Sequence, residues 1–160
     1  MSIVRFFMLL SLVVWIGGIA FFAFVLAPTV FHPGILPSRQ LAGQVVSRSL
    51  GILHWMGLTC GVVFLLTSVV DSQITTGFAS VFTARNLLVC VMIVLTLVSI
   101  FAISRPMLAL RNDMVSIDTI PQDDARRVEF NRLHVWSTRL ESAVLLLGLA
   151  VIYLTARRLS

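Results

Sequence analysis

Ionisable side chains at the mouth of an apolar stretch are the residues of this chain that could do chemistry. The stretch FNRLHVWSTRLESAVLLLGLAVIYL covers residues 130–154, and its second half is apolar enough to be a membrane helix. His134, Thr138 and Glu141 are four and three residues apart, so an α-helix places them on one face. A charged group within a membrane span is energetically unfavourable and indicates a functional site by default. We therefore interpret this face as part of a polar site.

Three histidines are the candidate partners of Glu141. His32 follows the first apolar segment, and His54 and His134 lie near the starts of the second and fourth segments. Because successive segments cross a membrane in opposite directions, all three histidines are expected at one face of it. His54 is the expected partner of the Glu141 carboxylate. The predicted polar pocket consists of His54, His134, Thr138 and Glu141.

The histidines have three interpretations that the sequence leaves open. Two imidazoles can ligate one haem b, with His54 and His134 as the axial pair. A soft metal such as copper could be held by His54, Met56 and Cys60. Alternatively, the imidazoles only form hydrogen bonds at the polar interface. Neither ligand spacing is a specific signature, so the leading expectation is that no cofactor is bound.

The composition indicates a membrane protein. The chain has 160 residues, enough for one domain that covers 1–160. It is 58% hydrophobic and only 12% charged, whereas soluble domains have about 25% charged residues. The net charge of +5 does not indicate nucleic-acid binding, because the arginines flank apolar segments. We expect the lipid bilayer as partner, other membrane subunits as candidate partners, and no nucleic acid.

Four apolar segments are long enough to cross a bilayer. They cover residues 6–27, 50–70, 87–103 and 135–156, close to the roughly 20 residues of a spanning helix. Their ends are marked by Pro28, by Asp71, by the sequence SRP at 104–106, and by Arg157 with Arg158. Backbone groups in lipid must be paired within their segment, so each should be helical. The predicted fold is an all-α integral membrane four-helix bundle.

The three connections differ in character. Loop 1, residues 29–49, begins as a Pro/Gly turn and continues as an amphipathic stretch that predicts a short interfacial helix. Loop 2, residues 71–84, is predicted to be a plain exposed loop. Loop 3, residues 105–134, holds most of the charges. The fourth helix is predicted to be continuous over 121–157, about 55 Å long, so its first turns should project into water beside an extension of the third helix.

Arginines and tryptophans at the segment ends are predicted to anchor the protein at the membrane interfaces. These anchors are Arg5, Arg139, Arg157, Arg158, Trp55 and Trp136. The side with loops 1 and 3 carries eight of the twelve arginines, so the positive-inside rule places those loops in the cytoplasm. We expect an integral protein of the bacterial inner membrane with both termini on one side. Gly57 and Gly61 predict close helix packing within one subunit.

Two stretches together resemble a known family. WIGGIAFFAFVLAPTVF at 15–31 and FNRLHVWSTRLESAVLLLGL at 130–149 are similar to the small four-helix membrane proteins that include eukaryotic transmembrane protein 205. The bacterial members form a domain of unknown function. RQLAGQVVSRSL and ISRPMLALR lie where that family has its first loop and the exit of its third helix. The resemblance implies a four-helix membrane fold without an established enzyme activity, and a link to platinum-drug resistance implies metal or drug handling.

These observations favour a non-catalytic integral membrane protein. It would be an accessory or structural subunit of a membrane assembly, or a handler of a small ligand. The alternative is a haem- or soft-metal-binding membrane protein in electron transfer or export, and a membrane enzyme comes third. The chain has no GxSxG, phosphate loop or HExxH motif. It also has no lysine that could form a Schiff base, so no catalytic residue is assigned.

Overall fold

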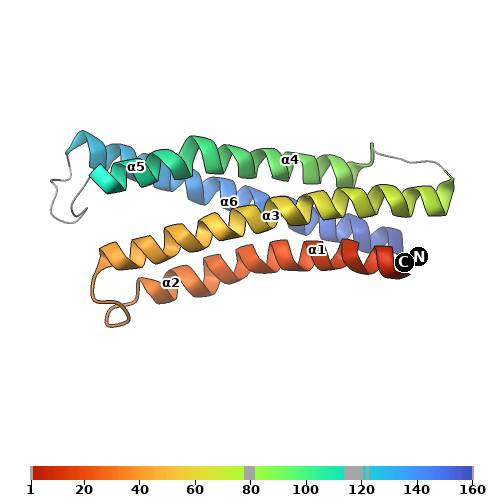
Figure 1. The fold of residues 1–160 in the computed structure, drawn as a ribbon, viewed down its shortest axis with the longest axis horizontal. Helices are drawn as coiled ribbons and strands as arrows, with labels where there is room; N and C mark the ends of the chain where they lie inside the picture. Colours follow the sequence, from red (N-terminus) through yellow and green to blue (C-terminus); the bar gives the residue numbers. More distant parts are fainter. Residues whose placement is uncertain (1, 78–81, 114–120, 122, 160) are drawn as a thin grey trace.

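The computed structural model describes residues 2–77, 82–113, 121 and 123–159, and the regular structure in these ranges is all helical. Four helical rods lie side by side, and the two chain ends lie at the same end of the bundle (Figure 1). Each rod is long and apolar enough to span a membrane. The spans are Ile3–Val30, Arg39–Thr76, Ala84–Asn112 and Ala125–Arg157. The prediction of an all-α membrane four-helix bundle is confirmed.

The first rod continues past the proline that was expected to end it. It consists of α1 (Ser2–Phe21), the π-helical turn η1 (Phe22–Leu26) and α2 (Ala27–Val30). Pro28 lies inside α2, although it has no N–H to donate to the preceding turn. The backbone N–H of Ala27 donates to the carbonyl of Phe22, which is the wider hydrogen bond of a π turn. The wider turn thus lies directly before the proline that the helix contains.

The third rod repeats this arrangement. It consists of α4 (Ala84–Val98), the π-helical turn η2 (Ser99–Ser104) and α5 (Arg105–Asp113). The expected helix end at the SRP sequence is wrong, because Pro106 lies within α5. The N–H of Arg105 donates to the carbonyl of Ile100 in the wider π spacing. In both rods the proline follows the last π residue by two positions.

The second rod is one continuous helix, α3 (Arg39–Thr76). It begins at Ser38, whose hydroxyl accepts a hydrogen bond from the Leu41 N–H at 3.2 Å, and ends at Gly77 in the left-handed conformation. The separate interfacial helix predicted in loop 1 is therefore wrong, since no residue after 39 interrupts the helix. The exposed loop predicted from Asp71 is also wrong as far as Thr76. Residues 78–81 of that loop lie outside the described residues.

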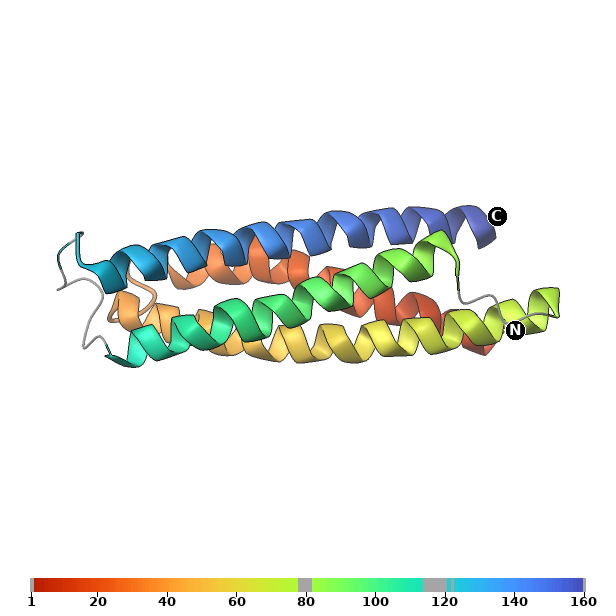
Figure 2. The ribbon, with the colours of Figure 1, turned by 90° about the horizontal axis from the view of Figure 1, so that it is seen from above.

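The fourth rod is α6 (Ala125–Leu159), which continues past His134 without a break as predicted. Its 35 residues correspond to about 52 Å. It begins at Ala125, four residues later than the predicted Pro121, directly after Asp124, whose carboxylate accepts the N–H of Arg126 at 2.8 Å. The first turns of α6 lie beside α5 (Figure 2). Residues 114–120 and 122 of loop 3 lie outside the described residues.

The core is built around a tryptophan held in a slot of glycines. Trp15 of α1 is 2% exposed. A Cβ atom on Gly57 would collide with its indole, and one on Gly61 would lie 2.9 Å from both Trp15 Cζ3 and Ile93 Cγ1. Gly148 of α6 similarly leaves room for Ile16. The two glycines of α3 therefore pack helices within this subunit, as predicted.

Candidate functional site

Glu141 lies on the stripe of α6 that packs into the bundle. The buried residues of this helix recur at spacings of three and four, as one face of an α-helix does. They are Phe130, Leu133, Ser137, Val144, Gly148, Val151 and Thr155. Glu141 is four residues after Ser137 and three before Val144, so the same periodicity turns its side chain inward. Its side chain is 16% exposed.

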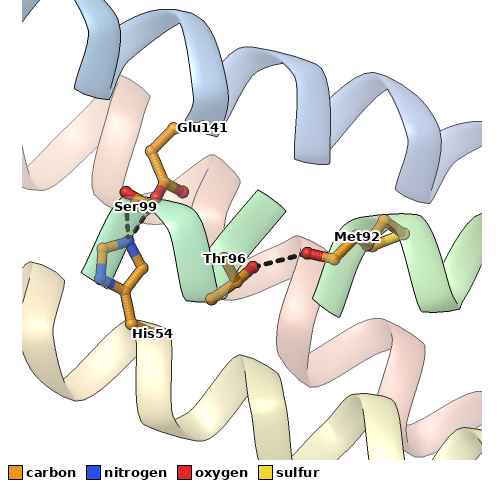
Figure 3. A network of polar contacts seen from close by, with 5 residues as sticks. All are labelled: His54, Met92, Thr96, Ser99 and Glu141. Carbon is orange, nitrogen blue, oxygen red and sulfur yellow. Dashed lines mark hydrogen bonds and ion pairs between the residues drawn. The ribbon is translucent and has the colours of Figure 1, made fainter. Parts of the chain in front are cut away.

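His54 and Glu141 meet between the helices. The Nε2 atom of His54 lies 2.5 Å from Oε1 of Glu141, and the imidazole is 3% exposed. Ser99 Oγ lies 3.3 Å from the same Nε2. Figure 3 shows the three side chains converging from α3, α6 and the start of η2. The contact between His54 and Glu141 that the sequence predicted is therefore present.

Ser99 is a site residue that sequence reasoning missed. It is the first residue of the π turn η2 and is 1% exposed. The available sequence signal was Pro106, since a proline within a helix indicates a local change of helix geometry in the preceding turns. Thr96, one turn earlier, does not join the pair, because its hydroxyl donates to the Met92 carbonyl at 2.9 Å (Figure 3).

The second ring nitrogen of His54 makes no hydrogen bond to any residue that the structure describes. Nδ1 is buried and has no hydrogen-bond partner among the described residues. A buried polar atom without a partner is unfavourable and calls for an explanation such as an absent ligand. The pair thus presents one open polar atom, with the other nitrogen fixed by Glu141.

The protonation of the pair determines what Nδ1 can bind. When the pair carries one negative charge, His54 is neutral, Nε2–H donates to the Glu141 carboxylate, and Nδ1 has a free lone pair. When one proton is added, the pair is neutral as a whole. Nδ1 then carries an N–H, whichever of the two groups holds the proton between them. A single proton therefore converts Nδ1 from an acceptor into a donor.

His134 and Thr138 do not belong to this pocket, contrary to the prediction. Both are exposed, and the Thr138 hydroxyl donates to the His134 carbonyl at 3.1 Å. His134 precedes Glu141 by seven residues, about 10 Å along the helix. The structure thus does not bring it to His54 as a second haem ligand. The spacing correctly indicated that His134 and Thr138 share a helical face. The buried residues of α6 at these levels are Leu133 and Ser137, each one position earlier.

The proposed copper ligands are also not brought together. Met56 faces α1, where a Cβ on Gly18 would lie 2.8 Å from the Met56 Cε atom. Cys60 is half-buried against the apolar core. Residues two and six positions apart point in different directions around a helix, so these side chains diverge from His54. Among the described residues, no group of three His, Cys, Asp or Glu side chains could hold a metal ion.

Several predicted interface anchors lie on the outer surface. Trp55 is 63% exposed and Trp136 is 50% exposed. The Arg139 guanidinium lies 5.3 Å from the centre of the Trp136 ring, and that of Arg157 lies 5.9 Å from the Tyr153 ring. The side chain of Arg158 lies outside the described part of the chain.

Arg5 has a different role from the anchor predicted for it. Its Nε donates to Oδ1 of Asp71 at 2.9 Å, and the Asp71 side chain is only 4% exposed. Nearby on the same helix, the Ser68 hydroxyl bonds to Oδ1 of Asn86 at 2.7 Å. Arg85 is buried beside Asn86. These residues form a second polar layer, at the end of the bundle that holds the chain ends, and sequence reasoning placed them in or near an exposed loop.

An apolar section separates the two polar layers. Ser68 follows His54 by 14 residues, about 21 Å along α3. The core at the intervening levels contains large apolar side chains that are fully or almost fully buried. They are Trp15, Phe64, Val89, Met92 and Val144. The His54–Glu141 pair therefore lies on the loop 1 and loop 3 side of this apolar section, near the middle of the helices that carry it.

The fold and the pair define a class, an all-α integral membrane bundle with a buried histidine–glutamate pair between its helices. The family described as Domain of unknown function (DUF4149) matches residues 10–116, more than half of the chain, and the chain belongs to this family. The matched region contains His54 and Ser99 and ends before Glu141. The comparisons with curated proteins and with solved structures found no match.

Proposed function

We propose that this protein handles a small ligand in the membrane and that it binds a proton together with that ligand at the His54–Glu141 pair. The observation that carries the proposal is the Nδ1 atom of His54, which has no partner in the described part of the chain although the imidazole is only 3% exposed. An ionisable pair inside a membrane bundle is a functional-site hypothesis by default. The leading ligand class is a small molecule or ion with a hydrogen-bond acceptor, which the protonated pair would bind through the Nδ1 N–H.

Access to the pair is proposed from the side of loops 1 and 3. Glu141 is two residues, about 3 Å along the helix axis, beyond Arg139. Arg139 lies over the exposed Trp136 ring, an arrangement typical of a membrane interface. The Glu141 carboxylate keeps some exposure, whereas the apolar section closes the core beyond the pair. These features support binding from one side and do not support a continuous path across the bundle.

Proton binding can be tested on the protein in lipid nanodiscs. Nitrogen NMR follows the His54 ring, and infrared difference spectroscopy follows the Glu141 carboxyl band across a pH series. We expect both signals to change over the same pH interval, because the two groups share one proton. Glu141→Gln should remove the carboxyl signal and shift the His54 transition.

The matched control is Glu129→Gln. Glu129 is on the same helix and forms an exposed ion pair with Arg132 at 2.8 Å. This variant should leave the His54 transition unchanged. An unaltered His54 transition in Glu141→Gln would refute the proposal that the pair binds the proton jointly.

A soft metal ion is the second candidate ligand. Histidines that ligate metals usually donate their other ring N–H to a carboxylate, and the His54–Glu141 contact has this arrangement. Copper(I) or haem iron could then bind at Nδ1. Metal analysis and a visible absorption spectrum of the purified protein test this candidate. Metal bound equally well by wild type and His54→Ala would exclude His54 as its ligand.

Three narrower expectations remain proposals. The first is kinship with transmembrane protein 205, which the resemblances at 15–31 and 130–149 support. The second is location in the bacterial inner membrane with loops 1 and 3 in the cytoplasm, supported by the arginine excess of those loops. The third is a role as an accessory subunit, which co-purification of other membrane proteins would test.

A further inference from the structure

Two hollows follow one another along the seam between the first rod and α3. The outer hollow, about 430 Å³, is lined by residues of loop 1 and the start of α3, including Phe31, His32, Leu36 and Arg39. The inner hollow, about 200 Å³, is lined by Gly18, Phe22 and Leu26 of the first rod and by Ser49, Leu53 and Met56 of α3. Figure 1 shows α1 and α2 running beside α3 toward loop 1 along this seam.

The two hollows share one face of α3. Arg39 and Ala42 line the outer hollow, and Ser49, Leu53 and Met56 line the inner one. The spacings of three, seven, four and three keep these residues on a single helical stripe. Arg39 precedes Leu53 by 14 residues, about 21 Å. An elongated molecule can therefore lie along the seam with one end at Arg39 and the other in the apolar hollow.

The chemistry of the seam changes along its length. The inner hollow has no charged residue and lies within the membrane-spanning helices. The outer hollow is lined by the exposed Arg39 and by His32, whose Nδ1 donates to the Pro33 carbonyl at 3.0 Å. Arg39 has no hydrogen bond or ion pair with any residue that the structure describes. No acidic residue precedes Asp71 in the sequence, so nothing from that part of the chain neutralises this guanidinium.

We propose that this seam binds one anionic phospholipid of the surrounding leaflet, with its phosphate at Arg39 and an acyl chain in the inner hollow. Basic side chains at the membrane surface attract anionic headgroups, and the apolar hollow accepts hydrocarbon. This charge complementarity combined with the apolar hollow distinguishes the occupant from a neutral lipid. The apolar hollow also distinguishes a phospholipid from free phosphate, because free phosphate has no acyl chain to fill the inner hollow.

Retained lipids can be counted by native mass spectrometry. The protein is released from nanodiscs that contain equal amounts of phosphatidylglycerol and phosphatidylcholine. Arg39→Gln should lower the retained phosphatidylglycerol about fivefold, as expected for one lost charge near the headgroups. The matched control is Arg48→Gln, because Arg48 is also exposed, lies nine residues on at the opposite face of α3, and lines neither hollow. The control should retain the lipid as the wild type does.

A second pair of variants tests the acyl chain. Ser49→Phe should fill the inner hollow and lower lipid retention without changing the charge. Val62→Phe, at a half-exposed position of the same helix outside the hollow, should leave retention unchanged. Equal losses in Arg39→Gln and Arg48→Gln would overturn the proposal in favour of general electrostatic attraction. Full displacement by inorganic phosphate would overturn it in favour of a phosphate site.

Discussion

The His54 imidazole and the Glu141 carboxylate are each other's hydrogen-bond partner in a mostly buried position. The imidazole is almost fully buried and the carboxylate mostly so, and Ser99 is the further side chain that contacts the pair through His54. A buried ion pair is not in itself a large source of stability, because desolvation of both groups offsets their attraction. Loss of one partner leaves the other buried without compensation. The stability effect of the pair should therefore be non-additive.

Leucine variants test this interdependence. His54→Leu alone should lower the free energy of unfolding by about 3 kcal/mol, the low end of values for broken buried pairs, since part of Glu141 remains exposed. His54→Leu combined with Glu141→Leu should recover most of that loss, because no unpaired carboxylate remains. Denaturant unfolding in detergent micelles measures both. A double variant less stable than the single one would contradict this account.

Arg111 is another residue whose role the sequence did not indicate. Its Nη1 donates to the Gly43 carbonyl at 2.6 Å and to Ser47 Oγ at 2.5 Å. Its guanidinium lies 5.4 Å from the centre of the Phe130 ring. One side chain of α5 thus contacts α3 and α6 together. The sequence shows only an arginine in a charged loop, because contacts between distant residues depend on how the helices pack.

The sequence predicted Glu141 and His54 better than the residues around them. A carboxylate inside an apolar run is unfavourable toward lipid, so its inward direction and a polar partner from the same end could be predicted. His134 and Thr138 could not be excluded in the same way. Their spacing indicates a face, but the rotation of α6 follows from packing partners such as Phe130 and Leu133, which are buried.

At the scale of elements, α3 packs along most of its length against α1 and also against α4. Its buried stripe contains the glycines that admit Trp15, and it also carries His54 and Asp71. Glycine in a helix interior is unfavourable by roughly 0.5–1 kcal/mol relative to alanine. At Gly57 the close approach of the indole explains why glycine is nevertheless present.

Alanine substitutions can separate these two effects. Gly57→Ala should destabilise the protein by about 1–3 kcal/mol, because the added methyl group collides with Trp15. Gly51→Ala is the matched control on the same helix, since a Cβ there meets nothing within 4 Å. That variant should be neutral or stabilise by up to about 1 kcal/mol. Thermal unfolding of both proteins in detergent gives the comparison. Equal effects of the two substitutions would contradict the inference that Gly57 is needed to make room for Trp15.

The start of α6 should depend on pH. Hydrogen bonds from the side chain and the backbone N–H of Arg126 lower the pKa of Asp124 from 3.8 to about 2. A lowered pKa means that the ionised cap contributes fully above the unfolded value near 4 and is lost as the pH falls toward about 2. We expect amide hydrogen exchange of the first turn of α6 to accelerate over this interval. Asp124→Asn keeps a capping side chain without a carboxylate, so its exchange should not show this transition.

Helix ends were predicted less well than helix existence. Proline usually ends a helix, yet Pro28 and Pro106 lie inside helical rods, each after a π turn. The composition of 71–76 indicates a loop, yet α3 continues there because Asp71 is buried against Arg5. In both cases tertiary contacts or an altered hydrogen-bond spacing override a local signal. Neither can be read from the neighbouring residues.

At the scale of the whole molecule, the four spans and the common end of the two termini agree with the sequence. Apolar length is a property of each segment by itself, which is why composition was enough to predict the bundle. The two polar layers depend on which helices are in contact. Of these layers, only the contact between His54 and Glu141 could be predicted from the sequence.

Topology in the membrane follows from these four spans. Reporter fusions at residues 1 and 160 should report the same side, and fusions in loops 1 and 3 should report the opposite side. The arginine excess predicts that the side of loops 1 and 3 is the cytoplasm. Alkaline phosphatase and fluorescent-protein fusions distinguish the two sides. Termini on opposite sides would mean that one of the four helices does not cross the membrane.

The apolar section between the polar layers also has an electrical consequence. A transmembrane voltage falls mainly across material of low dielectric constant, and here that material is the roughly 21 Å of packed apolar core between the levels of His54 and Ser68. A charge that crosses the full voltage changes in energy by about 2.3 kcal/mol per 100 mV. The His54–Glu141 pair borders this section on the side of loops 1 and 3, so a proton that reaches it from that side does not cross the section. Protonation of the pair should therefore follow the pH of that compartment and respond to only part of the membrane potential.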